Sequence, residues 1–309
     1  MTLGNDLLAV EEALGDLAQR GHPLGALTTY RVGGEAALFA ECRDEEQLLG
    51  VARALSGREV PVLVIGRGSN LLVADGGFPG LAVSLGSGFD RLDVAGTEVR
   101  CGAALSLPVL ARRSAAAGLH GLEWAVGVPG SVGGAIRMNA GGHGSDTAAT
   151  LVRYRYVDLL GGAAHDGDAS QLHFAYRYAA LSDTDVVTEG TYRLEPGDPA
   201  DGAAAIAEIV RWRRANQPGG SNAGSVFTNP DGDSAGRLIE ACGLKGHRVG
   251  TAEVSQRHAN FIQADADGSA DDVRRLVEEV RATVAESTGV LLETEVRMVG
   301  FTDQEHVAR

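Results

Sequence analysis

The chain contains almost no lysine and few cysteines. Lys245 is the one lysine among 27 basic residues, which stand against 41 acidic residues and give a formal net charge of -14. A chain this acidic lacks the basic face that binding to DNA or RNA requires. The three cysteines, Cys42, Cys101 and Cys242, are far apart and show no metal-binding spacing. The sequence therefore predicts reduced cysteines, no metal and no nucleic-acid partner.

Long hydrophobic runs are also missing. No apolar stretch reaches the roughly 18 residues that a membrane span needs. The first residues show no basic segment followed by an apolar core, so they do not resemble a secretory signal. Apolar residues make up 44% and charged residues 22% of the chain, which excludes a wholly disordered protein. We expect a cytoplasmic protein without membrane insertion.

Glycine, in contrast, is abundant, with 43 residues that cluster between Gly66 and Gly144 without any period. The segment GRGSN (66–70) follows a predicted buried strand, and a second segment, GVPGSVGGAIRMNAGG, covers 127–142. A single glycine turn after a strand is usually no more than a turn. Two such segments without a Walker lysine fit backbone N–H groups that cradle a diphosphate without a metal.

Hydrophobic periodicity and turn residues predict the elements. The segment 195–202, with two prolines and two glycines, is predicted to be a linker, so the main domain boundary is placed near 197 and a weaker one near 86. Helices are predicted over 6–19 (with Asn5 as N-cap), 44–56, 106–117 (with Ser106 as N-cap), 206–216, 234–244 and 269–286, and extended chain over 28–42, 62–65, 90–105, 151–195, 257–265 and 289–300.

Several polar residues stand in apolar or glycine-rich surroundings. Arg177 in FAYRY is either a surface arginine or a site residue. Ser225 in AGSVF stands beside a glycine, where a serine is usually a turn former. No G-x-S-x-G motif is present, so a hydrolase triad is unsupported. Glu293 and Glu295 alternate along a predicted strand, whose carboxylate face is either solvent or a site. His258 and Asn260 are expected to share one face of the predicted strand over 257–265, where a lone histidine is more often a structural residue than a ligand.

Taken together, these segments resemble the UDP-N-acetylenolpyruvoylglucosamine reductases of bacterial peptidoglycan precursor synthesis. The resemblance covers nearly the whole chain, and the order and number of its motifs make it specific. The matching motifs are TTYRVGGEA (28–36), IGRGSNLLVADGGFPGL (65–81), GLEWAVGVPGSVGGAIRMNAG (121–141), YR (176–177), QPGGSNAGSVFTNP (217–230), AGRLIEACGLKGHRVGTAEVSQRHANFI (235–262) and LLETEVRMVG (291–300).

The resemblance implies an α+β fold with two domains. The first, 1–197, is a two-lobed FAD-binding domain of the vanillyl-alcohol-oxidase (PCMH) type, with lobes of about 1–85 and 86–197. The second, 198–309, is a smaller α/β substrate-binding domain. It also implies noncovalent FAD, NADPH as the hydride source and reduction of the enolpyruvyl group of a UDP-sugar to give UDP-N-acetylmuramate. We expect a monomer whose partners are these small molecules.

Motif by motif, the resemblance implies catalytic roles for Arg177, Ser225 and Glu295. The short spacing between Arg177 and Ser225 resembles the second type of the family, which lacks an inserted tyrosine loop. Ala179 and His143 depart from the family pattern near the flavin and the substrate. The residues expected to bind FAD are Gly66, Arg67, Gly68, Ser69, Asn70, Pro129, Gly130, Ser131, Gly133, Gly134 and Asn139, and those expected to bind substrate are Tyr176, Arg213, Arg214, Asn229 and His258.

Two rival functions stay open. One is a flavin oxidase of the same superfamily with its flavin tethered to Cys101 or His143, the two candidates in the glycine-rich stretch. The other is a non-catalytic sensor of nucleotide sugars. Retention of flavin after denaturation would favour the first rival, and a colourless purified protein would favour the second.

Overall fold

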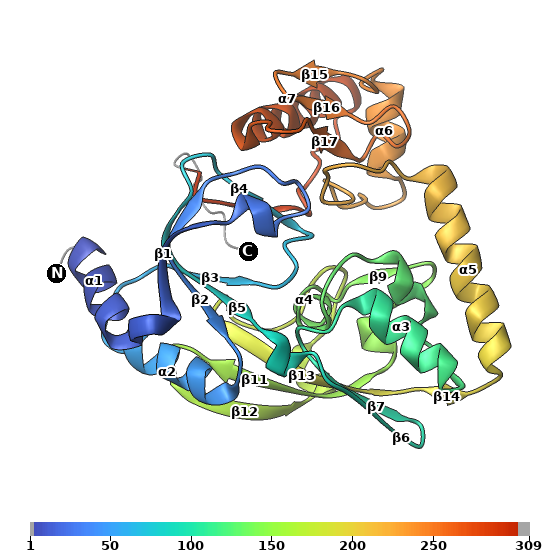
Figure 1. Cartoon of the computed structure of the whole chain (residues 1–309). Helices are drawn as coiled ribbons and strands as arrows, with labels where there is room; N and C mark the ends of the chain where they lie inside the picture. Colours follow the sequence, from blue (N-terminus) through green and yellow to red (C-terminus); the bar gives the residue numbers. More distant parts are fainter. Residues whose placement is uncertain (1–2, 302–309) are drawn as a thin grey trace. The chain divides into compact units, whose positions relative to one another are not determined.

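The computed structural model describes residues 3–301, which form two compact units (Figure 1). Unit 1 contains the chain up to residue 20, 38–67 and 80–215, and unit 2 contains 21–37, 68–79 and the chain from 216 onward. The backbone thus passes between the units several times, which one boundary cannot describe. The domains at 1–197 and 198–309 stay a prediction.

Unit 1 is built on a five-stranded antiparallel sheet in the order β12-β11-β13-β7-β6. One face packs against two helices, and Leu110, Ile136 and Tyr192 lie in the shared core (Figure 1). The strands are β6 (Leu92–Ala95), β7 (Glu98–Gly102), β11 (Leu151–Asp158), β12 (Ala163–Asp168) and β13 (Asp185–Arg193), and the helices are α3 (Leu107–Ala116) and α4 (Val132–Met138).

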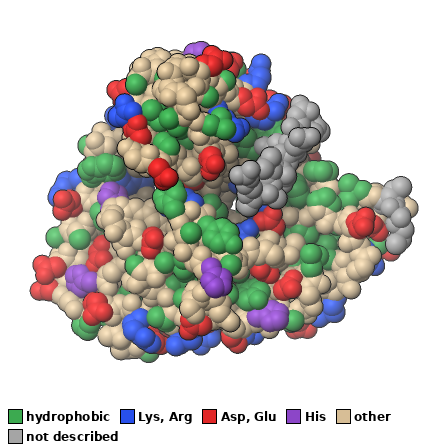
Figure 2. All heavy atoms as spheres, turned by 180° about the vertical axis from the view of Figure 1, so that it is seen from behind, with side chains coloured by type: hydrophobic (Ala, Val, Ile, Leu, Met, Phe, Trp, Pro, Cys, Tyr) green, Lys and Arg blue, Asp and Glu red, His purple; other side chains and the backbone are tan. Residues whose placement is uncertain are grey.

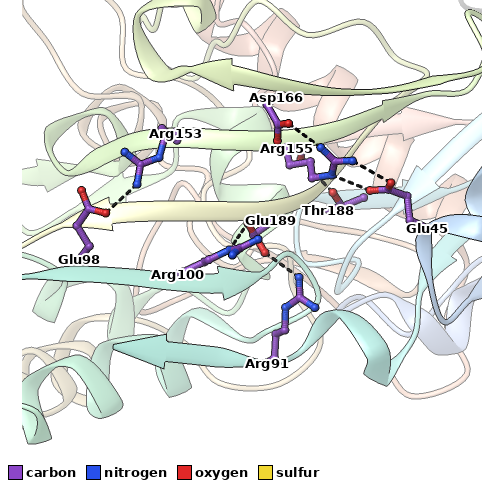
Figure 3. A network of polar contacts seen from close by, with 9 residues as sticks. All are labelled: Glu45, Arg91, Glu98, Arg100, Arg153, Arg155, Asp166, Thr188 and Glu189. Atoms are coloured by element: carbon purple, nitrogen blue, oxygen red, sulfur yellow. Dashed lines mark hydrogen bonds and ion pairs between the residues drawn. The ribbon is translucent and has the colours of Figure 1, made fainter. Parts of the chain in front are cut away.

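The opposite face of these strands carries an ion-pair network (Figure 3). Glu189, which is 7% exposed, accepts hydrogen bonds from Arg91 at 2.8 Å and Arg100 at 2.5 Å. Arg155 donates to both carboxylate oxygens of Glu45 at 2.8 and 2.9 Å. Because successive residues of a strand point to opposite faces, the same strands supply both an apolar core and this charged face.

A second sheet has the order β1-β2-β5-β3, and β2 and β5 begin in unit 2 and end in unit 1. Leu48, Val51 and Leu55 recur at helical spacing on α2 and are buried in a second core of unit 1 with Leu81 and Val83. The elements are α1 (Leu3–Leu14), α2 (Glu45–Leu55), β1 (Ala18–Pro23), β2 (Glu35–Cys42), β3 (Val62–Ile65) and β5 (Phe78–Leu85).

The predicted linker at 195–202 is wrong. Glu195 and Pro196 form β14 (Glu195–Pro196), which pairs with β8 (Leu119–His120), and α5 (Pro199–Asn216) begins three residues later. Proline is well suited to the first turn of a helix because its missing N–H needs no partner there. Gly197 packs so closely on His120 that a Cβ would lie 2.1 Å from its ring. The prolines and glycines thus serve packing.

Unit 2 combines the sheet β15-β16-β17 with two helices and a parallel pair, β4 and β18. On α7, Val273, Leu276, Val277, Val280 and Val284 lie in a core shared with the sheet. The elements are β4 (Leu71–Val73), α6 (Ala235–Ala241), β15 (Arg248–Val249), β16 (Ala252–Val254), β17 (Ile262–Ala264), α7 (Ala270–Thr288) and β18 (Arg297–Val299).

Several predicted elements are shorter than expected. The strand over 257–265 is confined to β17, because a turn in which Phe261 N–H bonds His258 C=O precedes it, so His258 and Asn260 share no strand face. The strand over 289–300 is confined to β18 and an isolated bridge at Thr294. Asn5 lies inside α1, and the first helix ends at Leu14. Ser106 is the N-cap of α3 but makes no side-chain capping bond.

The remaining elements are short. On the face shown in Figure 2, acidic and basic side chains are interspersed. No helix within residues 3–301 has the length and hydrophobicity that crossing a bilayer requires. The remaining short elements are η1 (Gly15–Leu17), η2 (Gly25–Leu27), η3 (Ser87–Phe89), η4 (Glu123–Gly127), β9 (Gly141–Gly142), β10 (Ser145–Asp146), η5 (Thr147–Ala149) and η6 (Ala169–Leu172).

Candidate active site

Arg177 occupies the third position of a tight turn, which Ala175 and Tyr178 close with reciprocal backbone hydrogen bonds of 3.2 and 3.1 Å. Its φ of 57° lies in the left-handed region, where a residue other than glycine is strained by roughly 1–3 kcal/mol. Its guanidinium lies 4.9 Å from the ring centroid of Tyr176, which is 58% exposed. Strain of this kind is typical of functional positions.

A buried asparagine anchors this turn. Asn139 ends α4, and its Nδ2 donates to the carbonyl oxygen of Ala175 at 3.0 Å and to Asp146 Oδ2 at 3.2 Å. Its Oδ1 accepts the N–H of Ala148 at 3.0 Å. Both N–H donors of the amide are therefore used within the protein. A contact between Asn139 and FAD stays a prediction, and the visible role of the side chain is to hold the turn that carries Arg177.

The two glycine-rich segments meet at Gly66 and Ser131, both in unit 1. A Cβ on Gly66 would lie 2.6 Å from Ser131 Oγ, so a side chain there would fill the space beside the hydroxyl. Ser131 is buried at the N-cap of α4, and its Oγ accepts the N–H of Gly134 at 3.3 Å. This bond uses an acceptor position of the hydroxyl and not its proton. The two segments thus approach closely at Gly66 and Ser131, and the expected contacts of both residues with FAD stay predictions.

The N–H groups of the second glycine-rich segment are largely used by the protein itself. Val132 N–H donates to Leu105 C=O and Gly133 N–H to Ala103 C=O, both at 2.9 Å. A Cβ on Gly133 would lie 3.0 Å from the Ala103 side chain. These glycines therefore allow close backbone packing, and the expected contacts of Pro129, Gly130, Gly133 and Gly134 with FAD stay predictions.

Gly68 is required by the packing of unit 2. A Cβ on Gly68 would lie 2.3 Å from Leu27 O and 2.7 Å from Thr28 Cα, and its φ is 56°. Its carbonyl accepts the N–H of Thr29 at 3.1 Å. A Gly68 variant without flavin would thus report a damaged fold as readily as a lost contact. Direct FAD contacts of Gly68, and of Arg67 and Ser69 beside it, stay predictions.

The structure brings the segments of Ser225 and Glu295 together within unit 2. Glu295 N–H donates at 2.8 Å to the carbonyl of Val226, the residue after Ser225. One step farther along, Thr228 N–H donates to Glu293 C=O at 2.9 Å. Arg177 belongs to unit 1.

Asn260 fixes the backbone next to Ser225. Its Oδ1 accepts the N–H of Phe227 at 3.0 Å, and its Nδ2 donates to the carbonyl of the same residue at 2.8 Å. Val226 and Phe227 are 0% and 1% exposed, so water cannot replace these bonds. The sequence does not predict this role of Asn260, because no local pattern marks it as the partner of Phe227.

Arg213, which is expected to bind substrate, donates to the carbonyl oxygen of Gly127 at the start of the second glycine-rich segment. Burial lowers the pKa of its guanidinium. Next to it, Trp212 meets His143 edge to face, with ring centroids 5.1 Å apart. Arg214 is exposed in the last turn of α5. Substrate contacts of Tyr176, Arg213 and Arg214 stay predictions.

Two further residues expected to bind substrate lie in unit 2. Asn229 is exposed, and its Oδ1 accepts the N–H of Ala235 in the first turn of α6 at 3.1 Å. It borders a cavity of about 260 Å³ next to Thr228. Burial and the charge of Lys245 lower the pKa of His258. Their substrate contacts also stay predictions.

The candidates for a covalent flavin link differ in their surroundings. Cys101 on β7 is fully buried, and burial together with the charge of Glu189 raises the pKa of its thiol. A thiol that is both inaccessible and protonated is a poor nucleophile. His143 is exposed, and burial of part of its ring together with Arg213 lowers its pKa. Across residues 3–301, no three His, Cys, Asp or Glu side chains are grouped to hold a metal.

Two family models match the chain. The C-terminal domain of UDP-N-acetylenolpyruvoylglucosamine reductase matches residues 216–299, and an FAD binding domain matches residues 36–166. A reductase of this name from Synechococcus sp. is 43% identical over 97% of this chain and 99% of its own length. A second one, from Symbiobacterium thermophilum, is 42% identical over 91% of this chain and 92% of its own length.

Solved structures give the same result for the fold. The crystal structure of UDP-N-acetylenolpyruvylglucosamine reductase from Thermus caldophilus has a TM-score of 0.80 and 36% identity, over 90% of this chain and 97% of that one. A variant of berberine bridge enzyme has a TM-score of 0.50 at 16% identity, over 63% of this chain and 44% of that one, which bears on the fold alone. The α+β fold with a PCMH-type FAD-binding domain and a second domain is confirmed.

Proposed function

Because the chain belongs to the UDP-N-acetylenolpyruvoylglucosamine reductase family, we propose that it reduces the enolpyruvyl group of UDP-N-acetylglucosamine enolpyruvate with NADPH. The product is UDP-N-acetylmuramate, a precursor of peptidoglycan, and the cofactor is FAD. The geometric observation that carries the proposal is the hydrogen bond between Glu295 and Val226, which sets the two motifs containing Glu295 and Ser225 side by side.

Residues of the glycine-rich segments fit the cofactor. The space between Gly66 and Ser131 would be filled by any side chain at position 66, and the hydroxyl of Ser131 has a proton to donate to a phosphate oxygen. The chemistry that FAD supplies when bound is transfer of a hydride from NADPH to the methylene carbon of the substrate. The buried, protonated thiol of Cys101 supports noncovalent binding.

Arg177 is assigned to the substrate carboxylate. When a hydride adds to the methylene carbon, negative charge spreads into the conjugated carboxylate. A guanidinium is always charged and matches a carboxylate with two parallel N–H donors. A fixed charge aimed at the place where charge develops is usually the largest catalytic contribution. The closed turn and the anchor by Asn139 support this role because both restrict where the Arg177 backbone lies.

Ser225 is assigned to the proton transfer that completes the reduction. Its hydroxyl proton goes to the carbon that bears the ether oxygen, and the serine oxygen regains a proton from solvent. A serine is a weak acid, so it donates only to a strongly basic centre held close to it. Glu295 is assigned to orienting the same carboxylate, and its backbone bond to Val226 places it beside the serine segment.

We also assign the binding of the UDP portion to the chain from 198 onward and the flavin to 1–197. The protein acts as a monomer in the cytoplasm, where NADPH and nucleotide sugars are found. The match of a C-terminal family model to 216–299 and of an FAD model to 36–166 supports this division.

The proposed function is tested with purified protein. Acid denaturation should release FAD into solution. NADPH should be consumed only when the enolpyruvyl ether is present, and the product should carry two hydrogens more than the substrate. UDP-N-acetylglucosamine, which lacks the enolpyruvyl group, is the control and should not support NADPH oxidation. The proposal would be overturned if flavin stays attached after denaturation, or if the rate of NADPH oxidation does not depend on the enolpyruvyl ether.

A further inference from the structure

The side chain of Asn70 contacts the backbone of Glu295, 225 residues away in the sequence. Its side-chain Nδ2 donates to the carbonyl oxygen of Glu295 at 3.0 Å, and the backbone carbonyl of Asn70 accepts the N–H of Arg297 at 3.1 Å. Asn70 therefore binds the chain directly after Glu295 at two points. All three residues belong to unit 2.

The other side of Glu295 is fixed as well. Its N–H donates to Val226 C=O at 2.8 Å, next to Ser225. The peptide groups before and after the Glu295 Cα are thus both held, one by the segment of Ser225 and one by Asn70. Since these two peptide groups define φ and ψ, the Cα–Cβ bond of Glu295 leaves the backbone in a fixed direction, and the carboxylate extends from this fixed point.

Regular sheet pairing cannot supply the bond that Asn70 makes. The parallel pair of β4 and β18 begins with Leu71 opposite Arg297, so Glu295 lies before the first paired residue. The side-chain amide of Asn70 extends the pairing by donating to the carbonyl that the strand backbone does not reach. A hydrophobic residue at position 70 offers no donor, and an aspartate would place a negative charge against the carbonyl.

We propose that Asn70 is a positioning residue for Glu295. It holds the Glu295 backbone in register with Ser225 and ties both to the end of the GRGSN turn. The proposal rests on the proposed function, in which Glu295 orients the substrate carboxylate. It gives the side chain of Asn70 a role in the reduction of the substrate, beside the contact with FAD that its place in the turn predicts.

The test compares two half-reactions of the flavin-loaded enzyme in a stopped-flow instrument. In FAD-loaded Asn70→Ala, flavin reduction by NADPH should lose much less of its wild-type rate than reoxidation does, and any loss in the reduction reports the predicted contact of Asn70 with FAD. Reoxidation of this variant by the enolpyruvyl substrate should be slower by roughly 10- to 100-fold, the size of effect that a catalytic group displaced by about 1 Å produces. The isosteric Asn70→Asp should show the same split and keeps the test usable if the alanine variant does not fold.

Thr228→Val is the matched control. Thr228 Oγ1 donates to the carbonyl of Glu293 at 3.3 Å, so this variant removes a side-chain bond to the backbone two residues before Glu295 and leaves the bonds of Glu295 itself in place. Both of its half-reactions should stay within a few-fold of wild type. A second control combines Asn70→Ala with Glu295→Gln. If Asn70 acts through Glu295, the double variant should be no slower than Glu295→Gln alone.

Three outcomes would overturn the proposal while leaving the proposed function intact. They are equal losses in both half-reactions, full reoxidation rates in both Asn70 variants, and independent effects that multiply in the double variant. The proposed function itself fails only if the reduced flavin of the wild-type enzyme is not reoxidised by the enolpyruvyl substrate.

Discussion

Arg177 lies on a turn between two exposed tyrosines, whereas Ser225 and Glu295 lie on two extended segments joined by an isolated bridge, where the adjacent Val226 and Val296 are buried. The turn holds a strained φ of 57° and is anchored by the amide of Asn139. The two extended segments are held by the amide of Asn260 and by backbone bonds around Val226. Both regions thus depend on an asparagine that is distant in the sequence.

The two asparagines differ in whether water can replace the hydrogen bonds that they make. The partners of Asn139 include Ala148 and Ala175, which are exposed, so water can take over their hydrogen bonds. The partner of Asn260 is the backbone of Phe227, which water cannot reach. The hydrogen bonds of Asn139 therefore mainly fix the conformation of a surface turn, whereas those of Asn260 fix the backbone conformation and also stabilise the folded protein.

The largest expected effect concerns Ser225. In Ser225→Ala, flavin reduction by NADPH should stay nearly unchanged, because that step needs no proton from the serine. Reoxidation by the enolpyruvyl substrate should slow by about 10⁴-fold or more, the upper end for one acid–base group. Ser225→Cys should recover part of the rate because a thiol is a stronger acid. Equal losses in both half-reactions would show that Ser225 has only a structural role in its turn.

The turn is tested by Arg177→Lys, which keeps the positive charge and removes the two parallel donors. Reoxidation by substrate should slow by about 10²- to 10³-fold, the usual loss for one donor at a centre of developing charge. Arg112→Lys on the surface of α3 is the matched control and should behave as wild type. Normal reoxidation in Arg177→Lys would contradict the assignment of this arginine to the carboxylate.

The contrast between the two asparagines predicts different losses of stability. Asn260→Ala should lower the free energy of unfolding by about 2–3 kcal/mol, because two buried backbone groups lose their partners. Asn139→Ala should cost about 1 kcal/mol or less, while slowing reoxidation by substrate about tenfold. Urea unfolding and the two half-reactions measure both effects. Equal losses of stability in the two variants would refute the contrast.

The smallest expected effect is the pH dependence that His258 contributes. Burial and Lys245 lower the pKa of His258 in the folded state, while Glu240 partly opposes the shift. The unfolded chain therefore binds the proton more readily, and stability should fall as the pH drops from about 6.5 toward the lowered pKa. Urea midpoints at pH 7.5 and 5.5 should differ more in wild type than in His258→Gln. The same difference in both proteins would exclude this contribution.

Local signals in the sequence predicted much of the fold. Periodicity and turn residues predict the strand over 62–65, the extended chain over 90–105, which forms the β6–β7 hairpin, and the helix over 44–56. The predicted linker at 195–202 failed because its prolines and glycines serve the start of α5 and close packing on His120. Composition alone does not distinguish these uses from a flexible connection.

The candidate site was predictable only in part, and for a physical reason. The motifs around Arg177, Ser225 and Glu295 are visible as local sequence. The amides that hold them come from residues 33 to 225 positions away, and nothing local marks the partner. The sequence predicts FAD contacts for Asn70 and Asn139, which stay predictions, and it does not reveal that their side chains hold the backbone at or near Glu295 and Arg177.

The most direct test of the account follows the flavin spectrum of the wild-type protein without oxygen. Addition of NADPH should bleach the oxidised flavin band, and subsequent addition of the enolpyruvyl ether should restore it in a single rapid phase. Arg177→Lys and Ser225→Ala, one variant from each region, should bleach normally and recover slowly. A wild-type spectrum that bleaches and does not return with the enolpyruvyl ether would contradict the central claim.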